Sequence, residues 1–400
     1  MIRHTFKLLW AFRRSNGWIF AELVVSFVVV WYLMDMTLHL AYNRHIPLGY
    51  DINQVYWYQE LASGEASTAP DLEHLKERIK HTPGVEEVLV TQRNDLLPFS
   101  SSFNGIDCTV DSLGTTHRVH AQRKLLRGND FFRVFDIRSA ITGEPTGFDL
   151  SNRHSVLITE DLAKALFAGK NPVGQTIYTG EDAYRVSDVI PRQKNVHALL
   201  PYPAIYFQES EAEADIVTIV AIRTREDFDV EAFRRDVAYC VPLEDEGKSM
   251  EALHGITRQE ILTRIVTLFF LASIALGVIG TFWFRVRKRR GEIGLRMALG
   301  ASRRSLLAGM VGEGVLLLTS ALPIVLLICA AIVYADLLYV PGLFGFSSHD
   351  SEYLVNRPWL RYAITSGLTY LLLAVVIALS SLIPAYMASR MQPVDSLRNE

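Results

Sequence analysis

The string Gly247-Lys248-Ser249 is the nearest approach in this sequence to a phosphate-binding loop. Such a loop needs a glycine five positions before its second glycine, so that backbone N–H groups can approach the phosphates closely, but that position is Pro242. The acidic lead-in Glu244 to Glu246 would also repel a phosphate. We therefore expect no nucleotide or other cofactor to be bound by this chain.

The sequence also lacks the motifs of a metal site or of a catalytic nucleophile. The 11 histidines are scattered, without the H-x-x-x-H or cysteine and histidine spacing of a metal site, and no G-x-S-x-G turn is present. Glu86 and Glu87 stand beside an expected strand, where solvated edge charges are the ordinary explanation. The sequence predicts no catalytic, cofactor-binding or metal residues, and thus a protein that is not an enzyme.

Two carboxylates interrupt an otherwise apolar stretch near the N-terminus. Glu22 and Asp35 lie within Trp18 to Leu40 and are candidate intramembrane polar residues. Each lies within two turns of an end of the stretch, where it can reach headgroups or water; a carboxylate in a span can also face a partner helix or a water-filled path. The sequence leaves both interpretations open.

Hydropathy places these residues in a membrane protein. Three stretches carry no charge, Ile265 to Phe284, Gly314 to Ala335 and Tyr362 to Ser389, with 20, 22 and 28 residues. Each is long enough to cross a bilayer, which takes about 20 residues. Buried helices of a soluble core are the alternative, and three such runs argue against it.

The stretch Trp18 to Leu40 is the fourth expected span. Trp10, Trp18, Trp31 and Tyr32 suit anchoring at the membrane interface. A cleaved signal peptide is the competing interpretation, but the stretch is too long and too aromatic, and no small-x-small cleavage site follows it.

Charge predicts the orientation of the spans. Residues 1 to 14 carry four basic and no acidic residues, and the segment Arg285 to Arg304 carries eight basic residues against Glu292. Basic segments stay in the cytoplasm, so both termini are expected inside and the region from about Ala41 to Glu260 outside. The cluster Arg285 to Arg290 would also suit nucleic acid or anionic lipid, but directly after a span it is better explained as a topology signal.

The outer region has the pattern of a mixed α/β domain. Val55 to Tyr58, Asp71 to His81 and Val85 to Thr91 predict one β-α-β unit, while Ile216 to Arg223 and Glu226 to Cys240 begin a second. Short alternating stretches between them predict an inserted β-rich subdomain. Met250 to Arg264 is amphipathic and predicts a helix that continues from this domain into the second span. Cys108 and Cys240 fall in the domain, and a disulfide between them stays open.

The fold class is therefore membrane α-helical, with four transmembrane helices and a large extracytoplasmic mixed α/β domain. The expected boundaries are a cytoplasmic segment 1–17, spans 18–40, 261–284, 312–335 and 362–384, the outer domain 41–260, an inner coupling loop 285–311, an outer loop 336–361 and a cytoplasmic tail 385–400.

The inner loop carries apolar residues on an expected short helix. Glu292 can pair with Arg296, four positions on. The apolar surface is formed by Ile293, Leu295, Met297, Ala298 and Leu299. An apolar patch exposed on so short a helix either docks on a partner or lies on the membrane surface. The pattern alone does not choose between these.

Several motifs resemble known permeases. Gly291 to Ser302 (GEIGLRMALGAS) is similar to the signature of FtsX-like ABC permeases, and Pro384 to Arg398 resembles their closing motif. Segments of the outer region resemble the periplasmic core domain of MacB-like proteins: Leu125 to Phe131, Ser155 to Glu160, Ala165 to Phe167 and Asn171 to Gln175. One departure is Tyr184 to Val189, where that family usually has a V-x-G-V pattern.

The resemblance implies a permease subunit of a MacB-type transporter in the bacterial inner membrane, which couples ATP hydrolysis by a separate ATPase chain to periplasmic movements that export a substrate. It implies two permease copies, like or unlike, with ATP and Mg²⁺ on the ATPase, and for efflux a periplasmic adaptor and an outer-membrane channel. Membrane lipids are expected partners and nucleic acid is not. The loop would be the ATPase-coupling helix, formed by Glu292, Ile293, Gly294, Leu295, Arg296, Met297, Ala298, Leu299, Gly300 and Ala301.

Other functions of related permeases stay open. An FtsX-like permease can control cell-wall hydrolases, although an outer domain of this size favours export. A lipoprotein-releasing permease shares the same topology. A membrane enzyme is the alternative from another class, and the lack of a catalytic constellation in the sequence argues against it.

Overall fold

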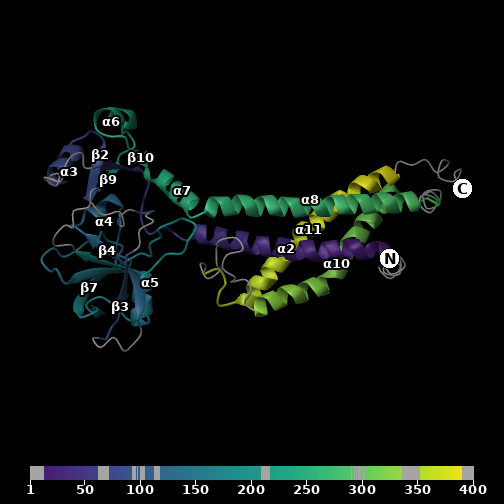
Figure 1. The fold of residues 1–400 in the computed structure, drawn as a ribbon, viewed down its shortest axis with the longest axis horizontal. Helices are drawn as coiled ribbons and strands as arrows, with labels where there is room; N and C mark the ends of the chain where they lie inside the picture. Colours follow the sequence, from purple (N-terminus) through teal and green to yellow (C-terminus); the bar gives the residue numbers. More distant parts are fainter. Residues whose placement is uncertain are drawn as a thin grey trace. The chain divides into compact units, whose positions relative to one another are not determined.

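The computed structural model describes residues 13–61, 72–91, 96, 98–99, 104–111, 118–208, 217–289, 291, 293, 295, 299–300, 302–335 and 352–389. The chain divides into two compact units, which are Met1–Tyr42 with Thr257–Glu400, and Asn43–Ile256 (Figure 1). The first unit holds the long apolar helices and the second holds the sheets.

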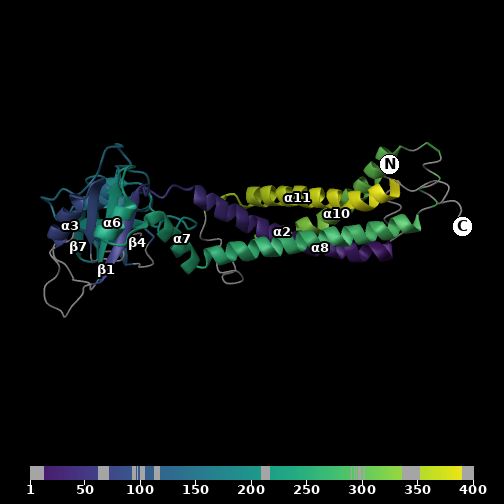
Figure 2. The ribbon, with the colours of Figure 1, turned by 90° about the horizontal axis from the view of Figure 1, so that it is seen from above.

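The membrane unit is built from long helices, α2 (Arg13–His45), α8 (Ile256–Lys288), α10 (Arg303–Tyr334) and α11 (Pro358–Ser389) (Figures 1 and 2). Among the described residues, four segments are long and apolar enough to cross a membrane: Gly17–His45, Ile256–Lys288, Arg304–Tyr334 and Pro358–Met387. The prediction of four transmembrane helices is confirmed.

The helices pack through one face and leave another exposed. Trp31 of α2, Phe282 of α8 and Leu318 of α10 belong to one buried cluster. The glycine at 314 lets α10 approach α11 closely, because a Cβ there would lie 2.9 Å from Cγ2 of Ile377. Leu276 is among the large apolar side chains exposed on α8, as expected for a surface that faces lipid.

The first sheet of the outer unit has the order β10-β1-β9-β2, formed by β1 (Val55–Leu61), β2 (Val85–Thr91), β9 (Val217–Thr224) and β10 (Val241–Pro242). Its paired strands are antiparallel. Helices α3 (Leu72–Lys80) and α6 (Val230–Asp236) each connect two strands that have one other strand between them. These are two split β-α-β units, which confirms the prediction.

The second sheet lies in the sequence between β2 and β9 and is the predicted β-rich insertion. Its order is β3-β4-β8-β5-β7-β6, with β3 (Gly105–Cys108), β4 (Val119–Leu126), β5 (Ser155–Thr159), β6 (Thr176–Thr179), β7 (Asp182–Ile190) and β8 (Ala204–Gln208). Helices α4 (Asp130–Val134) and α5 (Glu160–Phe167) accompany it.

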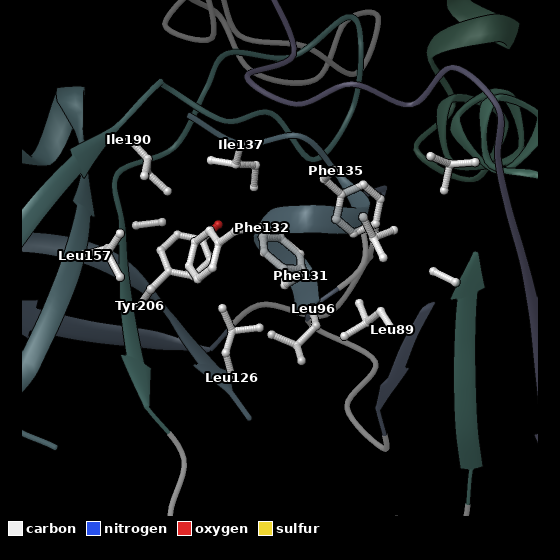
Figure 3. Close-up of a cluster of buried hydrophobic side chains, with 14 of the residues drawn as sticks. Leu89, Leu96, Leu126, Phe131, Phe132, Phe135, Ile137, Leu157, Ile190 and Tyr206 are labelled. Carbon is white, nitrogen blue, oxygen red and sulfur yellow. The ribbon is translucent and has the colours of Figure 1, made fainter. Parts of the chain in front are cut away.

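A shared core joins the two sheets. Phe131, Phe132 and Phe135, in and just after α4, pack with Tyr206 of the second sheet and Leu89 of the first (Figure 3). The rings of Phe131 and Phe135 meet edge to face, with centroids 5.0 Å apart. One apolar cluster of the outer domain therefore spans both sheets, and each sheet contributes to a further cluster of its own.

Strand β7 departs from a regular register at the position where the sequence departs from the V-x-G-V pattern. Val156 pairs with Val186 but Leu157 pairs with Asp188, so Ser187 is an extra residue in a bulge. The hydroxyl of Ser187 donates to the carbonyl of Val156 at 3.0 Å. The Asp188 carboxylate accepts from the hydroxyl of Ser139 at 2.7 Å. Polar side chains thus stabilise a bulge for which glycine is a common solution.

Two of the predicted helices differ from the structure. The helix predicted over Glu226 to Cys240 is shorter, because α6 begins after Asp229, whose side chain accepts from the N–H of Ala232, and ends at Asp236. The continuous helix predicted from Met250 into the second span is wrong. Helix α7 (Leu243–Leu253) ends before Gly255, which has φ +74°, and α8 begins at Ile256.

The half-buried ring of His197 is expected to make the stability of the outer domain depend on pH. It stacks on Phe99 with the ring centroids 4.9 Å apart. Burial is the largest cause that lowers the pKa of His197 from 6.5. As the pH falls through that value the unfolded chain binds a proton first, so stability is lost. We expect the melting temperature of the full chain to drop between about pH 7.5 and about pH 5.5, and His197→Gln to reduce the drop. Equal drops in both proteins would contradict this.

Candidate coupling site and polar contacts of the membrane helices

The segment after α8 is helical at Gly291, Ile293 and Leu295 and has a turn at Leu299 and Gly300. The N–H of Ile293 donates to the carbonyl of Arg289 and that of Leu299 to the carbonyl of Leu295, both at 3.0 Å. Leu295 is 53% exposed and Leu299 is 79% exposed. Being four residues apart, the two leucines share one face of a helix. The other predicted coupling residues, Glu292, Gly294, Arg296, Met297, Ala298 and Ala301, lie outside the described residues, and so does the pairing of Glu292 with Arg296.

Residues next to one another in the sequence end this helical segment and begin α10. Gly300 has φ +93°, the left-handed conformation that commonly terminates a helix. Two residues later the hydroxyl of Ser302 accepts the N–H of Ser305 at 3.2 Å and caps α10. The order glycine, alanine, serine therefore stops one helix and starts the next.

An ion-pair cluster joins the helices on either side of the segment. Arg285 of α8 donates through Nη1 to Oε1 of Glu313 in α10. Nη1 of Arg289 lies 3.8 Å from Oε2 of the same carboxylate. All three side chains are largely removed from solvent. We call Arg285, Arg289 and Glu313 the inner clamp. The sequence analysis did not predict this cluster. It interpreted the basic residues as a signal for membrane orientation, and Glu313 only marked the start of the charge-free stretch that follows it.

Asp35 forms a buried ion pair within the membrane unit. Its Oδ1 accepts from Nε of Arg361 at 2.9 Å and from the hydroxyl of Thr365 at 3.2 Å, while Oδ2 accepts from Nη2 of Arg361. Both charged side chains are almost completely buried. One turn away on α2, Nε1 of Trp31 donates to the hydroxyl of Ser366 at 3.0 Å. Polar groups thus connect α2 to α11 over two turns.

Glu22 also faces a helix. Its Oε1 accepts from the hydroxyl of Ser273 in α8 at 3.1 Å. A Cβ at Gly277 would lie 2.7 Å from Oε2 of Glu22, so the glycine makes room for the carboxylate. The structure therefore brings Glu22 to α8 and Asp35 to α11. Arg361, which the sequence analysis did not select, could have been found as the basic residue adjoining the last charge-free run.

The structure also shows where the residues considered for nucleotide binding, metal binding and a disulfide lie. Gly247, Lys248 and Ser249 lie inside α7, where Nζ of Lys248 donates to Asp245 at 2.9 Å. Among the described residues, no group of three or more metal-ligating side chains is found. Cys108 and Cys240 are free and belong to different buried clusters, so they form no disulfide here.

Family models match most of the chain. Residues 24–238 match the model described as MacB-like periplasmic core domain. Residues 264–393 match the model described as FtsX-like permease C-terminal. The first match includes every strand of the two outer sheets except β10, and the second includes the inner segment with Leu295 and Leu299.

Two curated relatives and one solved structure are similar to parts of the chain. The macrolide export ATP-binding/permease protein MacB of Escherichia coli is 25% identical over 293 residues, which are 68% of this chain and 43% of that protein. Its namesake in Sodalis glossinidius is 26% identical over 323 residues, 74% of this chain and 47% of that protein. The chain thus spans less than half the length of either. The periplasmic region of MacB from Actinobacillus actinomycetemcomitans aligns with TM-score 0.31 and 16% identity, covering 52% of this chain and 86% of that one.

Proposed function

Because this chain belongs to the family of FtsX-like permeases with a MacB-like periplasmic core domain, we propose that it transmits movement from a partner ATPase to its outer domain and so exports a substrate. Export is the role printed in the names of the relatives in Escherichia coli and Sodalis glossinidius. ATP and Mg²⁺ on the partner supply the driving force, and the residues of this chain receive and pass on the displacement.

The two exposed leucines of the inner segment carry this proposal. Leu295 and Leu299 stand on one helical face and are 53% and 79% exposed. Burying the exposed parts of these two side chains on a partner contributes about 2–4 kcal/mol to the contact. We assign this face, together with its neighbours from Glu292 to Ala301, as the docking site of the ATPase.

In this proposal the inner clamp couples the docking face to helices α8 and α10. Arg285 lies in the last turn of α8 and Arg289 directly follows that helix, while Glu313 lies in α10 after the segment. Since these charges are largely shielded from water, their attraction is stronger than that of a surface pair. A push on the docking face therefore moves the inner ends of α8 and α10 together.

The orientation and the assembly belong to the same proposal. The basic residues around the inner segment favour a cytoplasmic position for it and for both termini, with the outer domain in the periplasm of a bacterial inner membrane. Two permease copies, a pair of ATPase chains and, for efflux, an adaptor with an outer-membrane channel complete the assembly. The apolar residues exposed on α8 and α11, such as Leu276 and Leu371, contact lipid or the second copy.

Substitution of both leucines tests the docking assignment. The variant Leu295→Asp with Leu299→Asp, purified through a tag from its native membrane, is expected to retain its fold and to lose at least about 90% of the copurified ATPase activity, because charges replace the buried apolar contact. The measurement is ATP hydrolysis per purified permease.

Leu150→Asp is the matched control, since Leu150 is 56% exposed and lies on the outer domain. The control should retain the copurified activity. If the double leucine variant retains it as well, the docking face lies elsewhere and the proposed function loses the observation that carries it.

A further inference from the structure

The end of α8 carries basic residues on two different faces. Arg285 and Arg289 turn toward α10 and share the carboxylate of Glu313 in the inner clamp. Arg287 and Lys288 lie on the outward face and are exposed. Among the described residues, neither of these two forms an ion pair with a carboxylate. A signal for membrane orientation depends on the number of basic residues and not on the face that they occupy, so it does not account for the outward pair.

The outward face of α8 is apolar up to this point. Leu276 is 70% exposed, and Trp283 and Phe284 are 49% and 53% exposed. Residues four apart share a helical face, so Arg287 follows Trp283 on it and Lys288 follows Phe284. The uncharged stretch of α8 ends at Phe284. Aromatic rings followed by basic side chains are typical of the depth at which acyl chains give way to lipid headgroups.

One contact shows how the outermost lysine lies. Nζ of Lys288 is 4.9 Å from the ring centroid of Phe284, one turn earlier. The attraction between the ammonium and the face of the ring holds the two together. Because side chains of a helix lean toward its N-terminus, the lysine reaches back over the ring instead of extending into water. Its three N–H donors therefore lie beside the interface, where phosphate oxygens of a lipid are suitable acceptors.

The balance of charge at this end of the bundle favours an anion. Four basic side chains, those of Arg285, Arg287, Lys288 and Arg289, face one carboxylate, that of Glu313. The C-terminal end of α8 adds about half an elementary negative charge, so a positive excess remains. Each basic residue at an anionic leaflet contributes an attraction that corresponds to about a fivefold preference. The two outward residues together correspond to a preference of about 25-fold for an anionic over a zwitterionic headgroup.

We propose that Trp283, Phe284, Arg287 and Lys288, on the outward face at the end of α8, form a binding site for the headgroup of an anionic phospholipid. The two rings contact the glycerol and the upper part of the acyl chains, and the two basic side chains bind the phosphate. A lipid bound there holds this end of α8 at its depth in the membrane. The inference goes beyond the proposed function and does not depend on an ATPase, because it concerns only the lipid and α8.

Quenching of Trp283 by brominated lipids tests the site, because bromine on an acyl chain quenches tryptophans that it contacts. The chain has 6 tryptophans, so the signal is the quenching that Trp283→Phe removes. The full chain is placed in phosphatidylcholine nanodiscs with brominated phosphatidylglycerol or brominated phosphatidylcholine. We expect the first lipid to bind about 25-fold more strongly than the second, and Arg287→Gln with Lys288→Gln to make the two nearly equal. Equal binding of the two lipids by the native chain overturns the inference.

Arg258→Gln with Arg264→Gln is the matched control. These arginines are exposed on the same helix, nearer its other end, and their replacement removes the same total charge. The control should keep the preference for phosphatidylglycerol, whereas molar salt should weaken that preference in the native chain, because exposed charges are screened. If the control loses the preference as well, the net charge of the protein attracts the lipid and the proposed site is wrong.

Two other occupants of this face are outcomes of the same experiment. If neither brominated lipid quenches Trp283, a second copy of the chain covers the face and the inference fails. If soluble glycerol phosphate displaces brominated phosphatidylglycerol as well as the unlabelled lipid does, the site binds free phosphate and the inference also fails. The proposed function is tested separately. If the variant with both leucines replaced retains the ATPase while the lipid preference is found, only the proposed function fails.

Discussion

Replacing Arg361 alone by methionine is expected to lower the free energy of unfolding of the membrane unit by about 3–5 kcal/mol, the usual cost of leaving a buried charge without its partner. Arg361 holds both carboxylate oxygens of Asp35, and the two side chains are almost completely buried. Thr365 would remain as a single donor to the carboxylate. Thermal unfolding of the full chain in nanodiscs measures the loss.

The double variant Asp35→Leu with Arg361→Met is the control for this prediction. Removing both charges leaves no uncompensated group, and apolar replacement of a buried ion pair is often neutral or stabilising. We expect the double variant to regain most of the stability that Arg361→Met loses. If the double variant is no more stable than Arg361→Met, an uncompensated Asp35 is not the cause of the loss.

Replacing Gly49 by alanine is expected to destabilise the outer domain by about 2–5 kcal/mol, as the sum of an overpacked contact and a left-handed non-glycine residue. Gly49 has φ +85°, and a Cβ there would lie 2.0 Å from the carbonyl oxygen of Arg192. The obstacle is backbone, two residues before Lys194, so it cannot rotate away. The variant is assayed by thermal unfolding of the full chain.

Gly128→Ala is the matched control for the Gly49 variant. Gly128 has φ +72°, but a Cβ there would meet no atom within 4 Å. Only the conformational cost remains, about 1–2 kcal/mol. Equal losses at the two positions would show that the backbone conformation, and not the contact with Arg192, makes Gly49 necessary.

The sequence predicted the classes and order of the elements well where a local pattern carried them. The two β-α-β units and the inserted sheet followed from short apolar runs and turn residues, and β2 begins and ends at the predicted residues Val85 and Thr91. The predicted helix across Gly255 failed because amphipathic periodicity continued on both sides of it. A glycine after the last periodic residue is a recognised stop signal, and it was the better guide here.

The sequence indicated the coupling face that contains Leu295 and Leu299, and its role as the docking site of an ATPase is a proposal. Leu295 and Leu299 are exposed, as a docking face requires, and the inner clamp beside them was not predicted. Arg285 and Glu313 are 28 residues apart in the chain. Charge counting treats such residues one by one, and nothing in the local pattern indicates which basic residue will meet which acid.

Hydropathy and composition by themselves determined that this protein has four apolar spans, because a bilayer requires about 20 uncharged residues for each and tolerates few exceptions. They also singled out Glu22 and Asp35 as costly exceptions. Only the tertiary structure decided what those carboxylates do. Asp35 meets Arg361 across 326 residues of chain, and Lys194 reaches the end of α2 across 151. Such pairs form when helices and loops pack, since burial forces each charge to find a partner that the sequence alone does not identify.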